Sequence, residues 1–285
     1  MTEHVTLVEV APRDGLQNEA SIIPADQKIK LINLLSACGF ARIEAASFVS
    51  PRWVPQMADG AAVLAGIDRR PGTRYAALTP NMKGYAAAKA ARADEIAVFA
   101  SASEGFSQAN LNCSVAESLE RFAPIAAAAR ADALPMRGYV SCVTDCPFDG
   151  PVAPEAVARV AGHLHDAGCY EISLGDTLGR ASPERVDAML TAVLEAVPAS
   201  ALAGHFHDTG EQALANIDVS LGHGLRVFDA AAGGLGGCPY APGAAGNVAT
   251  EAVVAHLDNL GFGTGIDANR LAEAANFARG LRAEA

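Results

Sequence analysis

The chain has 285 residues, of which 51% are hydrophobic and 19% charged, and this balance excludes an intrinsically disordered protein. Its formal net charge of −11 argues against nucleic acid or an anionic membrane as a main partner. No apolar run is long enough to predict a membrane-spanning helix, and the first four residues, Met-Thr-Glu-His, lack the features of a secretion signal.

A unit of strand followed by helix begins the chain and then recurs. A β-branched segment over 5–10 ends in the turn sequence Pro-Arg-Asp-Gly, and a helical pattern follows over 25–37. Further strand-like segments begin near Arg42, Thr73, Glu95, Met136, Glu171, Ala201 and Val227. Helical periodicity is found between them, over 114–131, 154–167, 182–196 and 210–221.

Eight strands that alternate with helices predict one (β/α)₈ (TIM) barrel, and no change of composition marks a linker, so we expect a single domain over 1–285. A helix from Thr250 to about Leu260 completes the last unit. The segment 267–282 predicts an extra C-terminal helix, which would cover a barrel end or a partner subunit. The alternative is a doubly wound open sheet, but no glycine-rich nucleotide fingerprint follows the first strand.

The segment Gly204-His205-Phe206-His207-Asp208-Thr209 is the strongest local indication of chemistry. In a strand, alternate side chains share a face, so His205 and His207 point the same way and Phe206 points the other way. Two imidazoles on one face make half of a divalent-metal site. The alternative is a pair of hydrogen-bonded histidines with a structural role.

Polar residues at other strand ends strengthen the metal interpretation, because reactive groups of such barrels gather where strands end. Asp14 with the two histidines supplies three ligands of the kind that Mg²⁺ or Mn²⁺ takes, whereas the cysteines are not spaced for a thiolate zinc site. Arg13, Glu44 and Asp176 are expected at the same mouth. Their structural alternatives are a surface turn, an arginine partner inside the barrel and a helix cap, respectively.

A long segment rich in glycine and proline follows the eighth strand, over about 233–247, and predicts a lid over the barrel mouth. Cys238 within it is a candidate acid, base or nucleophile. Asn247 is a candidate N-cap of the next helix, a candidate metal ligand through its side-chain oxygen, or both. The other cysteines show no paired spacing, which indicates reduced thiols in a cytoplasmic protein.

Four motifs together resemble the 3-hydroxy-3-methylglutaryl-CoA lyase family, and they occur in the family's order along nearly the whole chain. They are Val-Glu-Val-Ala-Pro-Arg-Asp-Gly-Leu-Gln-Asn-Glu at 8–19, Ile-Glu-Ala-Ala-Ser-Phe-Val-Ser-Pro at 43–51, Gly-His-Phe-His-Asp-Thr at 204–209 and Gly-Gly-Cys-Pro-Tyr at 236–240.

The resemblance implies a role for each matching residue. Asp14, His205 and His207 would bind Mg²⁺ or Mn²⁺, with Asn247 as a further ligand. Arg13 and Gln17 would contact the acyl-CoA substrate, Arg13 at its thioester oxygen. Three residues complete the implied site: Glu44 would orient Arg13 and nearby water, Cys238 would act as an acid when the loop closes, and Asp176 would support the metal ligands.

The implied reaction is a retro-Claisen cleavage of 3-hydroxy-3-methylglutaryl-CoA to acetyl-CoA and acetoacetate in leucine breakdown, by a cytoplasmic enzyme that forms a homo-oligomer, expected to be a dimer. One alternative keeps the chemistry on another 3-hydroxyacyl-CoA, such as the isohexenyl homologue or citramalyl-CoA. Ala230, Ala231 and Gly210 depart from the family pattern and predict a roomier or less polar mouth. Another alternative is a catalytically silent barrel kept for binding.

Overall fold

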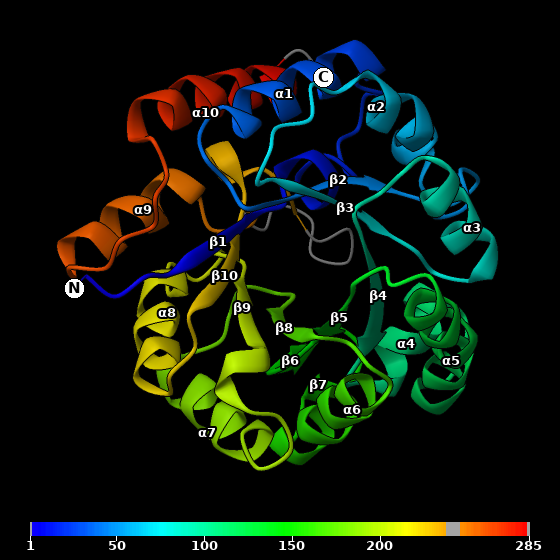
Figure 1. Ribbon diagram of the computed structural model, residues 1–285. Helices are drawn as coiled ribbons and strands as arrows, with labels where there is room; N and C mark the ends of the chain where they lie inside the picture. Colours follow the sequence, from blue (N-terminus) through cyan, green and yellow to red (C-terminus); the bar gives the residue numbers. More distant parts are fainter. Residues whose placement is uncertain (1, 238–245, 284–285) are drawn as a thin grey trace.

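The computed structural model describes residues 2–237 and 246–283, and its centre is a closed barrel of eight parallel strands (Figure 1). The last barrel strand pairs with the first, with Thr6 opposite Val227 and Glu9 opposite Ala230. In barrel order, the strands are β1 (Thr6–Glu9), β10 (Val227–Ala230), β9 (Leu202–Phe206), β8 (Glu171–Asp176), β5 (Met136–Ser141), β4 (Glu95–Ser101), β3 (Arg74–Leu78) and β2 (Arg42–Ser47). The prediction of a TIM barrel is therefore confirmed.

Helices form a ring around this barrel (Figure 1). They are α1 (Ala25–Ser36), α2 (Gly60–Gly66), α3 (Met82–Ala90), α4 (Glu104–Leu111), α5 (Val115–Ala131), α6 (Pro154–Asp166), α7 (Pro183–Val193), α8 (Ala213–Gly222), α9 (Thr250–Asn259) and the extra C-terminal helix α10 (Ala268–Ala283). Among the described residues, no helix is long and apolar enough to cross a membrane.

Short elements complete the structure. A π-helical turn, η1 (Ala11–Gly15), follows β1, and 3₁₀ turns occur at η2 (Pro55–Met57), η3 (Ala199–Ala201) and η4 (Ala232–Gly234). A small antiparallel hairpin, β6 (Asp145–Cys146) with β7 (Gly150–Pro151), follows β5.

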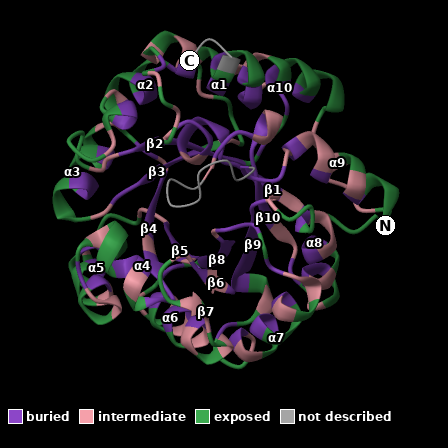
Figure 2. Cartoon of the chain, turned by 180° about the vertical axis from the view of Figure 1, so that it is seen from behind, coloured by how far each residue is buried: buried purple, intermediate pink, exposed green. Residues whose placement is uncertain are grey.

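Side-chain alternation along the strands separates an apolar layer from a polar barrel interior. On β5, Gly138 faces outward, because a Cβ there would meet side chains of Ile172 and Leu164. Arg137 beside it faces inward and reaches Asp229 on β10 across the barrel. Figure 2 shows the strands almost entirely buried, so these charged groups lie away from solvent. Buried charges require partners, and the barrel interior supplies them as ion pairs.

Local chemistry explains where the helices begin. Ser114 caps α5 in a reciprocal capping box with Glu117, as the sequence pattern favours. The helix predicted from residue 210 instead begins at Ala213, because Glu211 has a positive φ of 58° and cannot continue a right-handed helix. The Asp208 carboxylate accepts a hydrogen bond from the Ala213 amide at that start.

Candidate metal centre and active site

Asp14, His205 and His207 come together at the carboxyl-terminal mouth of the barrel. One potential ligand atom from each lies within 4.8 Å of the other two. The Nε2 atoms of both histidines are 3.9 Å from Asp14 Oδ2, too far for a hydrogen bond. Ligands about 2.1 Å from one ion in octahedral geometry lie about 3–4 Å apart, so this donor set fits a divalent cation.

The strand places the two imidazoles as its alternation predicts. His205 lies on β9 and His207 directly follows it, and their ring centroids are 5.4 Å apart. Phe206 between them is buried on the outer side, where a Cβ on Gly204 would touch its ring and that of Phe228. Asp14 comes from the π-helical turn η1 rather than from the end of β1 itself. Gly15 allows that turn to approach Leu235, where a Cβ would clash at 2.8 Å.

Asn247 lies against this group but does not cap a helix. Its backbone forms an isolated antiparallel β-bridge with His207. Its side-chain Nδ2 donates hydrogen bonds to Asp14 Oδ2 at 2.8 Å and to the Leu235 carbonyl at 3.1 Å. The N-cap interpretation is wrong, because Ala249 occupies the N-cap position of α9. The Oδ1 atom of Asn247 is buried without a hydrogen-bond partner among the described residues, so an oxygen that could ligate a cation lies near the three candidate ligands.

Arg13 lies between two carboxylates. Its Nε donates to Glu44 Oε2 at 2.7 Å, and its Nη1 donates to Asp14 Oδ1 at 2.6 Å. Burial lowers the pKa of Arg13, but the charges of Glu44 and Asp14 outweigh burial and hold it above the usual range. Burial raises the pKa of Asp14, yet Arg13 and the histidines reverse this and lower it to about 2. The Asp14 carboxylate is therefore ionised, as a metal ligand must be.

Glu44 and Gln17 lie beside Arg13 and Asp14. Burial raises the pKa of Glu44, and its Oε1 has no hydrogen-bond partner within the described part of the chain. Gln17 donates from Nε2 to Asp14 Oδ1 at 3.0 Å, so it lies at the mouth with its amide on the candidate ligand carboxylate. The structure thus brings Arg13, Glu44 and Gln17 to the predicted place.

A second layer of charge, which the sequence motifs did not predict, lies beneath His205. The Nδ1 atom of His205 is 3.1 Å from Asp229 Oδ2, and Arg137 donates to both oxygens of Asp229. Burial raises the pKa of Asp229, but Arg137 outweighs it and the pKa falls well below the usual range. The available signal was a carboxylate inside the apolar strand sequence Val-Phe-Asp-Ala at 227–230.

Asp176 is buried at the end of β8, and its carboxylate binds the loop that follows this strand. Its Oδ2 accepts a hydrogen bond from the Ala181 amide at 2.9 Å. Gly179 in that loop packs closely on the His207 backbone, where a Cβ would lie 2.8 Å from the His207 carbonyl carbon. The helix-cap interpretation is wrong, because Ser182 occupies the N-cap position of α7 and Ala181 precedes that helix. Support of the metal ligands by Asp176 stays a prediction.

Cys238 lies outside the described residues, as does the rest of 238–245, so its role as an acid stays a prediction. The described flank of the loop is tied to two other segments. Asn18 Nδ2 donates to the Gly237 carbonyl at 2.9 Å, and Arg282 Nη2 on α10 donates to the Gly236 carbonyl at 2.7 Å.

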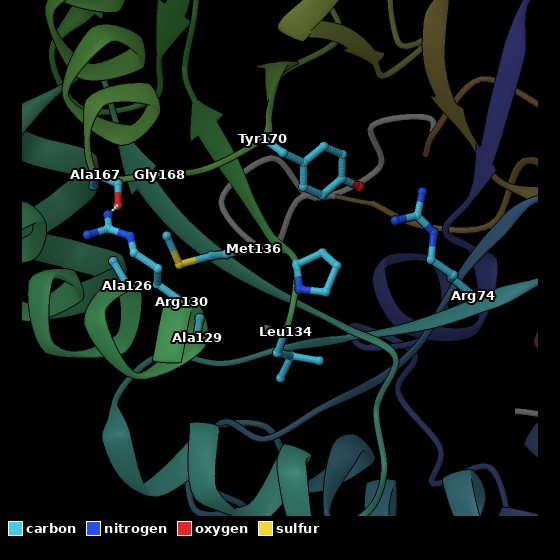
Figure 3. Close-up of a pocket in the computed structure, with 10 residues that line it drawn as sticks. Arg74, Ala126, Ala129, Arg130, Leu134, Met136, Ala167, Gly168 and Tyr170 are labelled. Carbon is cyan, nitrogen blue, oxygen red and sulfur yellow. Dashed lines mark hydrogen bonds between the residues drawn. The ribbon is translucent and has the colours of Figure 1, made fainter. Parts of the chain in front are cut away.

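A surface cavity of about 310 Å³ lies at the opposite, amino-terminal end of the strands (Figure 3). It is lined by Arg74, Ala126, Ala129, Arg130, Leu134, Pro135, Met136, Ala167, Gly168 and Tyr170. The Arg130 guanidinium points to the Ala167 carbonyl and donates to it at 3.2 Å. None of the predicted site residues that the structure describes lines this cavity, so it is separate from the candidate metal centre.

Comparison with known proteins agrees with the motifs and the geometry. A family model described as HMGL-like matches residues 4–278. The chain belongs to the HMGL-like family. It is 54% identical to the mitochondrial hydroxymethylglutaryl-CoA lyase of Gallus gallus over 96% of this chain and 92% of that protein. It is 55% identical to the 3-hydroxy-3-isohexenylglutaryl-CoA/hydroxy-methylglutaryl-CoA lyase of Pseudomonas aeruginosa over 96% and 91%, respectively.

A solved structure is similar over the full barrel. The HMG-CoA lyase of Brucella melitensis has 63% sequence identity and a TM-score of 0.97, with 99% of each chain covered. The family resemblance predicted from the four motifs is therefore confirmed.

Proposed function

We propose that this chain is a divalent-metal-dependent hydroxymethylglutaryl-CoA lyase, which cleaves 3-hydroxy-3-methylglutaryl-CoA to acetyl-CoA and acetoacetate. The observation that carries the proposal is the convergence of Asp14, His205 and His207 beside Arg13 at the barrel mouth. The names of the relatives support the substrate, and the intact donor set argues against a silent barrel.

Asp14, His205 and His207 would hold the metal ion, with Asn247 beside them, and we propose Mg²⁺ or Mn²⁺ because the donors are oxygen and imidazole. The bound ion supplies Lewis-acid polarisation of substrate oxygens. The chain itself supplies a fixed cation at the place where negative charge develops on the thioester. Arg13 is suited to this task because Glu44 and Asp14 fix its guanidinium in one orientation.

Glu44 offers a buried acceptor next to Arg13. One carboxylate oxygen is engaged by Arg13, and the other has no partner among the described residues. That oxygen is positioned to accept a hydrogen bond from substrate or from a water molecule near Arg13. Glu44 would thereby orient both the arginine and the water.

Cleavage of the carbon-carbon bond leaves an enolate that needs a proton before it re-adds, and we propose Cys238 as the donor. A thiol is a much stronger acid than a hydroxyl. Cys238→Ser should therefore fold and bind metal while it loses most turnover. Alkylation should inactivate the enzyme faster than it modifies Cys142, which is fully buried. Wild-type kcat in Cys238→Ser would mean that the proton comes from another group.

The deciding experiment is a coupled assay of acetyl-CoA release from 3-hydroxy-3-methylglutaryl-CoA. The protein is first stripped of metal with a chelator, and Mg²⁺ or Mn²⁺ is then restored. We expect turnover only with restored metal. Turnover that is unaffected by the chelator would contradict the metal dependence, and no turnover with any added divalent ion would contradict the lyase function.

A second substrate, 3-hydroxy-3-isohexenylglutaryl-CoA, is favoured by the name of the Pseudomonas relative. The departures at Ala230 and Ala231 do not support it, because both residues are fully buried. They pair through their backbones with Val10 and Val248. Side-by-side kcat/KM values for the methyl and isohexenyl esters discriminate the two, and strict rejection of the longer ester removes this candidate.

Assembly and location complete the proposal. We propose that the protein is cytoplasmic, because the spacing of its cysteines does not indicate disulfides. We also propose that it forms a homodimer, from the family resemblance. Analytical ultracentrifugation would measure the subunit number, and a monomer at micromolar concentration would contradict it.

A further inference from the structure

We infer that Asp229 and Arg137 are positioning residues of the metal centre, which fix the imidazole of His205 from beneath. The inference rests on the proposed metal centre and deepens it. It assigns to two buried residues, on β10 and β5, a function that the sequence analysis did not give them.

Asp229 fixes the proton of His205. A carboxylate accepts hydrogen bonds only, so the contact of 3.1 Å places the ring proton on His205 Nδ1. The lone pair is then on Nε2, the atom that faces Asp14. Histidines that ligate metals commonly donate their other ring nitrogen to a carboxylate, which sets tautomer and orientation.

Besides His205, three donor atoms within the described part of the chain hold Asp229. Arg137 Nη2 donates to Oδ1 at 2.7 Å and Arg137 Nη1 to Oδ2 at 3.1 Å, while Ser173 Oγ donates to Oδ2 at 2.7 Å. All these side chains are buried. An asparagine at 229 would turn its amide group against one of these donors in either orientation, so it could not preserve the arrangement.

Arg137 is fixed from its other side. Its Nε donates to Glu171 Oε1 at 2.7 Å, and Glu171 is also bound by both terminal nitrogens of Arg42, at 2.6 and 3.0 Å. Arg137 Nη1 also donates to the Tyr139 hydroxyl at 2.8 Å. A continuous line of ion pairs therefore runs from β2 and β8 at the barrel floor to the imidazole at its mouth.

The second histidine, His207, lacks the support that Asp229 gives to His205. Its Nδ1 is buried and has no hydrogen-bond partner in the described part of the chain. Among residues 2–237 and 246–283, no carboxylate hydrogen-bonds this second histidine as Asp229 does His205. The two ligands of one site are therefore held differently, and the positioning effect should appear at His205 alone.

The test is Mn²⁺ binding to the full-length, metal-stripped protein, measured from the electron paramagnetic resonance signal of free Mn²⁺. We expect Asp229→Asn to weaken binding about 10- to 100-fold, the usual range for residues behind a metal ligand. Arg137→Lys should weaken it to a smaller extent, because one charge is kept but the planar fork is lost. Glu95→Gln is the matched control, since Glu95 is also a buried carboxylate inside the barrel but contacts no candidate ligand.

Two further measurements separate positioning from general damage. Long-range ¹H–¹⁵N spectra of the histidine rings report the tautomer, and the His205 signal, assigned by its loss in His205→Ala, should change in Asp229→Asn and not in Glu95→Gln. A double-mutant cycle should show no added loss of Mn²⁺ affinity for Asp229→Asn in a His205→Ala background, and an added loss in a His207→Ala background.

The outcomes are distinguishable. If Asp229→Asn binds Mn²⁺ as Glu95→Gln does, with the His205 tautomer unchanged, the positioning function is overturned while the proposed lyase stands. If the wild-type protein itself binds no Mn²⁺ or Mg²⁺, both proposals fail. Should Arg137→Lys not fold, Asp229→Asn and the ring spectra still decide the matter.

Discussion

Two neighbouring residues on η1, Arg13 and Asp14, show how one turn presents opposite charges for different tasks. Asp14 directs one carboxylate oxygen toward the histidines, and the other oxygen accepts from Arg13. Arg13 in turn binds Glu44. Under the proposed function, the turn would supply both an anionic ligand and a cation whose orientation is fixed before substrate enters, which would avoid reorganisation during the reaction.

Arg13→Lys tests that division of tasks. We expect the variant to fold and to bind Mn²⁺ as the wild type does, because Asp14 and both histidines remain. The kcat should fall about 100-fold or more, since an ammonium group cannot reproduce the two-sided contact of the guanidinium. Steady-state kinetics and Mn²⁺ titration check this. Arg74→Lys, at the opposite end of the barrel, is the control. A raised KM with unchanged kcat would restrict Arg13 to substrate binding.

The alternation along β9 gives a paired prediction at residues 205 and 206. His205→Ala should abolish turnover and most Mn²⁺ affinity, with little change in the melting temperature of the metal-free protein. Phe206→Ala should leave Mn²⁺ affinity nearly unchanged but lower the free energy of unfolding by about 3–5 kcal/mol, because it opens a cavity between barrel and helices. Urea denaturation and Mn²⁺ titration of both variants check the pair, and near-normal metal binding by His205→Ala would remove His205 from the site.

At the scale of elements, one buried carboxylate joins four of them. Glu9 at the end of β1 accepts hydrogen bonds from the Ala11 amide of η1 and the Ala232 amide of η4, at 2.8 and 3.0 Å. Its other oxygen accepts from the Thr250 hydroxyl of α9 at 2.8 Å. The side chain is fully buried, and this burial raises the pKa of Glu9 to about 7.

The raised pKa predicts a pH dependence of stability. The folded protein holds the Glu9 proton up to about pH 7, whereas the unfolded chain releases it near pH 4.5. Stability from this group is therefore present below pH 4.5 and is lost as the pH rises to 7, by up to about 3 kcal/mol. Urea denaturation at pH 5 and at pH 8 measures the free energy of unfolding at each pH. From pH 5 to pH 8, this free energy should fall less in Glu9→Gln than in the wild type. Glu120→Gln, at an exposed position on α5, should follow the wild type, and equal pH dependence in all three proteins would contradict the prediction.

Elements and site were predictable to different extents, for physical reasons. Apolar residues that repeat every 2 positions in strands and about every 3.6 positions in helices form local patterns. The barrel, and the common face of His205 and His207, therefore follow from sequence alone. The helices α2, α3 and α4 were not among the predicted segments; α2 and α4 are only 7 and 8 residues long, and their apolar patterns span barely two turns. The N-cap alternative for Asn247 was wrong because the contacts of its side chain are tertiary, to Asp14 and Leu235. The Asp229–Arg137 pair joins residues 92 positions apart, and no local pattern predicts such a partner.

At the scale of the whole molecule, the metal ion should stabilise the fold, because its ligands belong to distant parts of the chain. Binding to the folded state alone adds about 2.7 kcal/mol at a concentration 100 times the Kd. Excess Mg²⁺ or Mn²⁺ should therefore raise the melting temperature by several degrees over protein in chelator. Differential scanning fluorimetry measures the shift, with His205→Ala as the control. An equal shift in that variant would place the ion elsewhere.

The junction of β1 and β10 also bears on how the protein is made. Asp14 meets Asn247 across 233 positions of sequence, and Glu9 meets Thr250 across 241. During synthesis on the ribosome, Asp14 emerges early, but the strand beside it and the asparagine emerge only when most of the chain has been translated. The ion cannot template the early steps of folding, since its full set of donors does not yet exist. With the proposed ligands, metal capture would therefore be a late event, and a nascent chain stalled before the last strand would lack part of the proposed site.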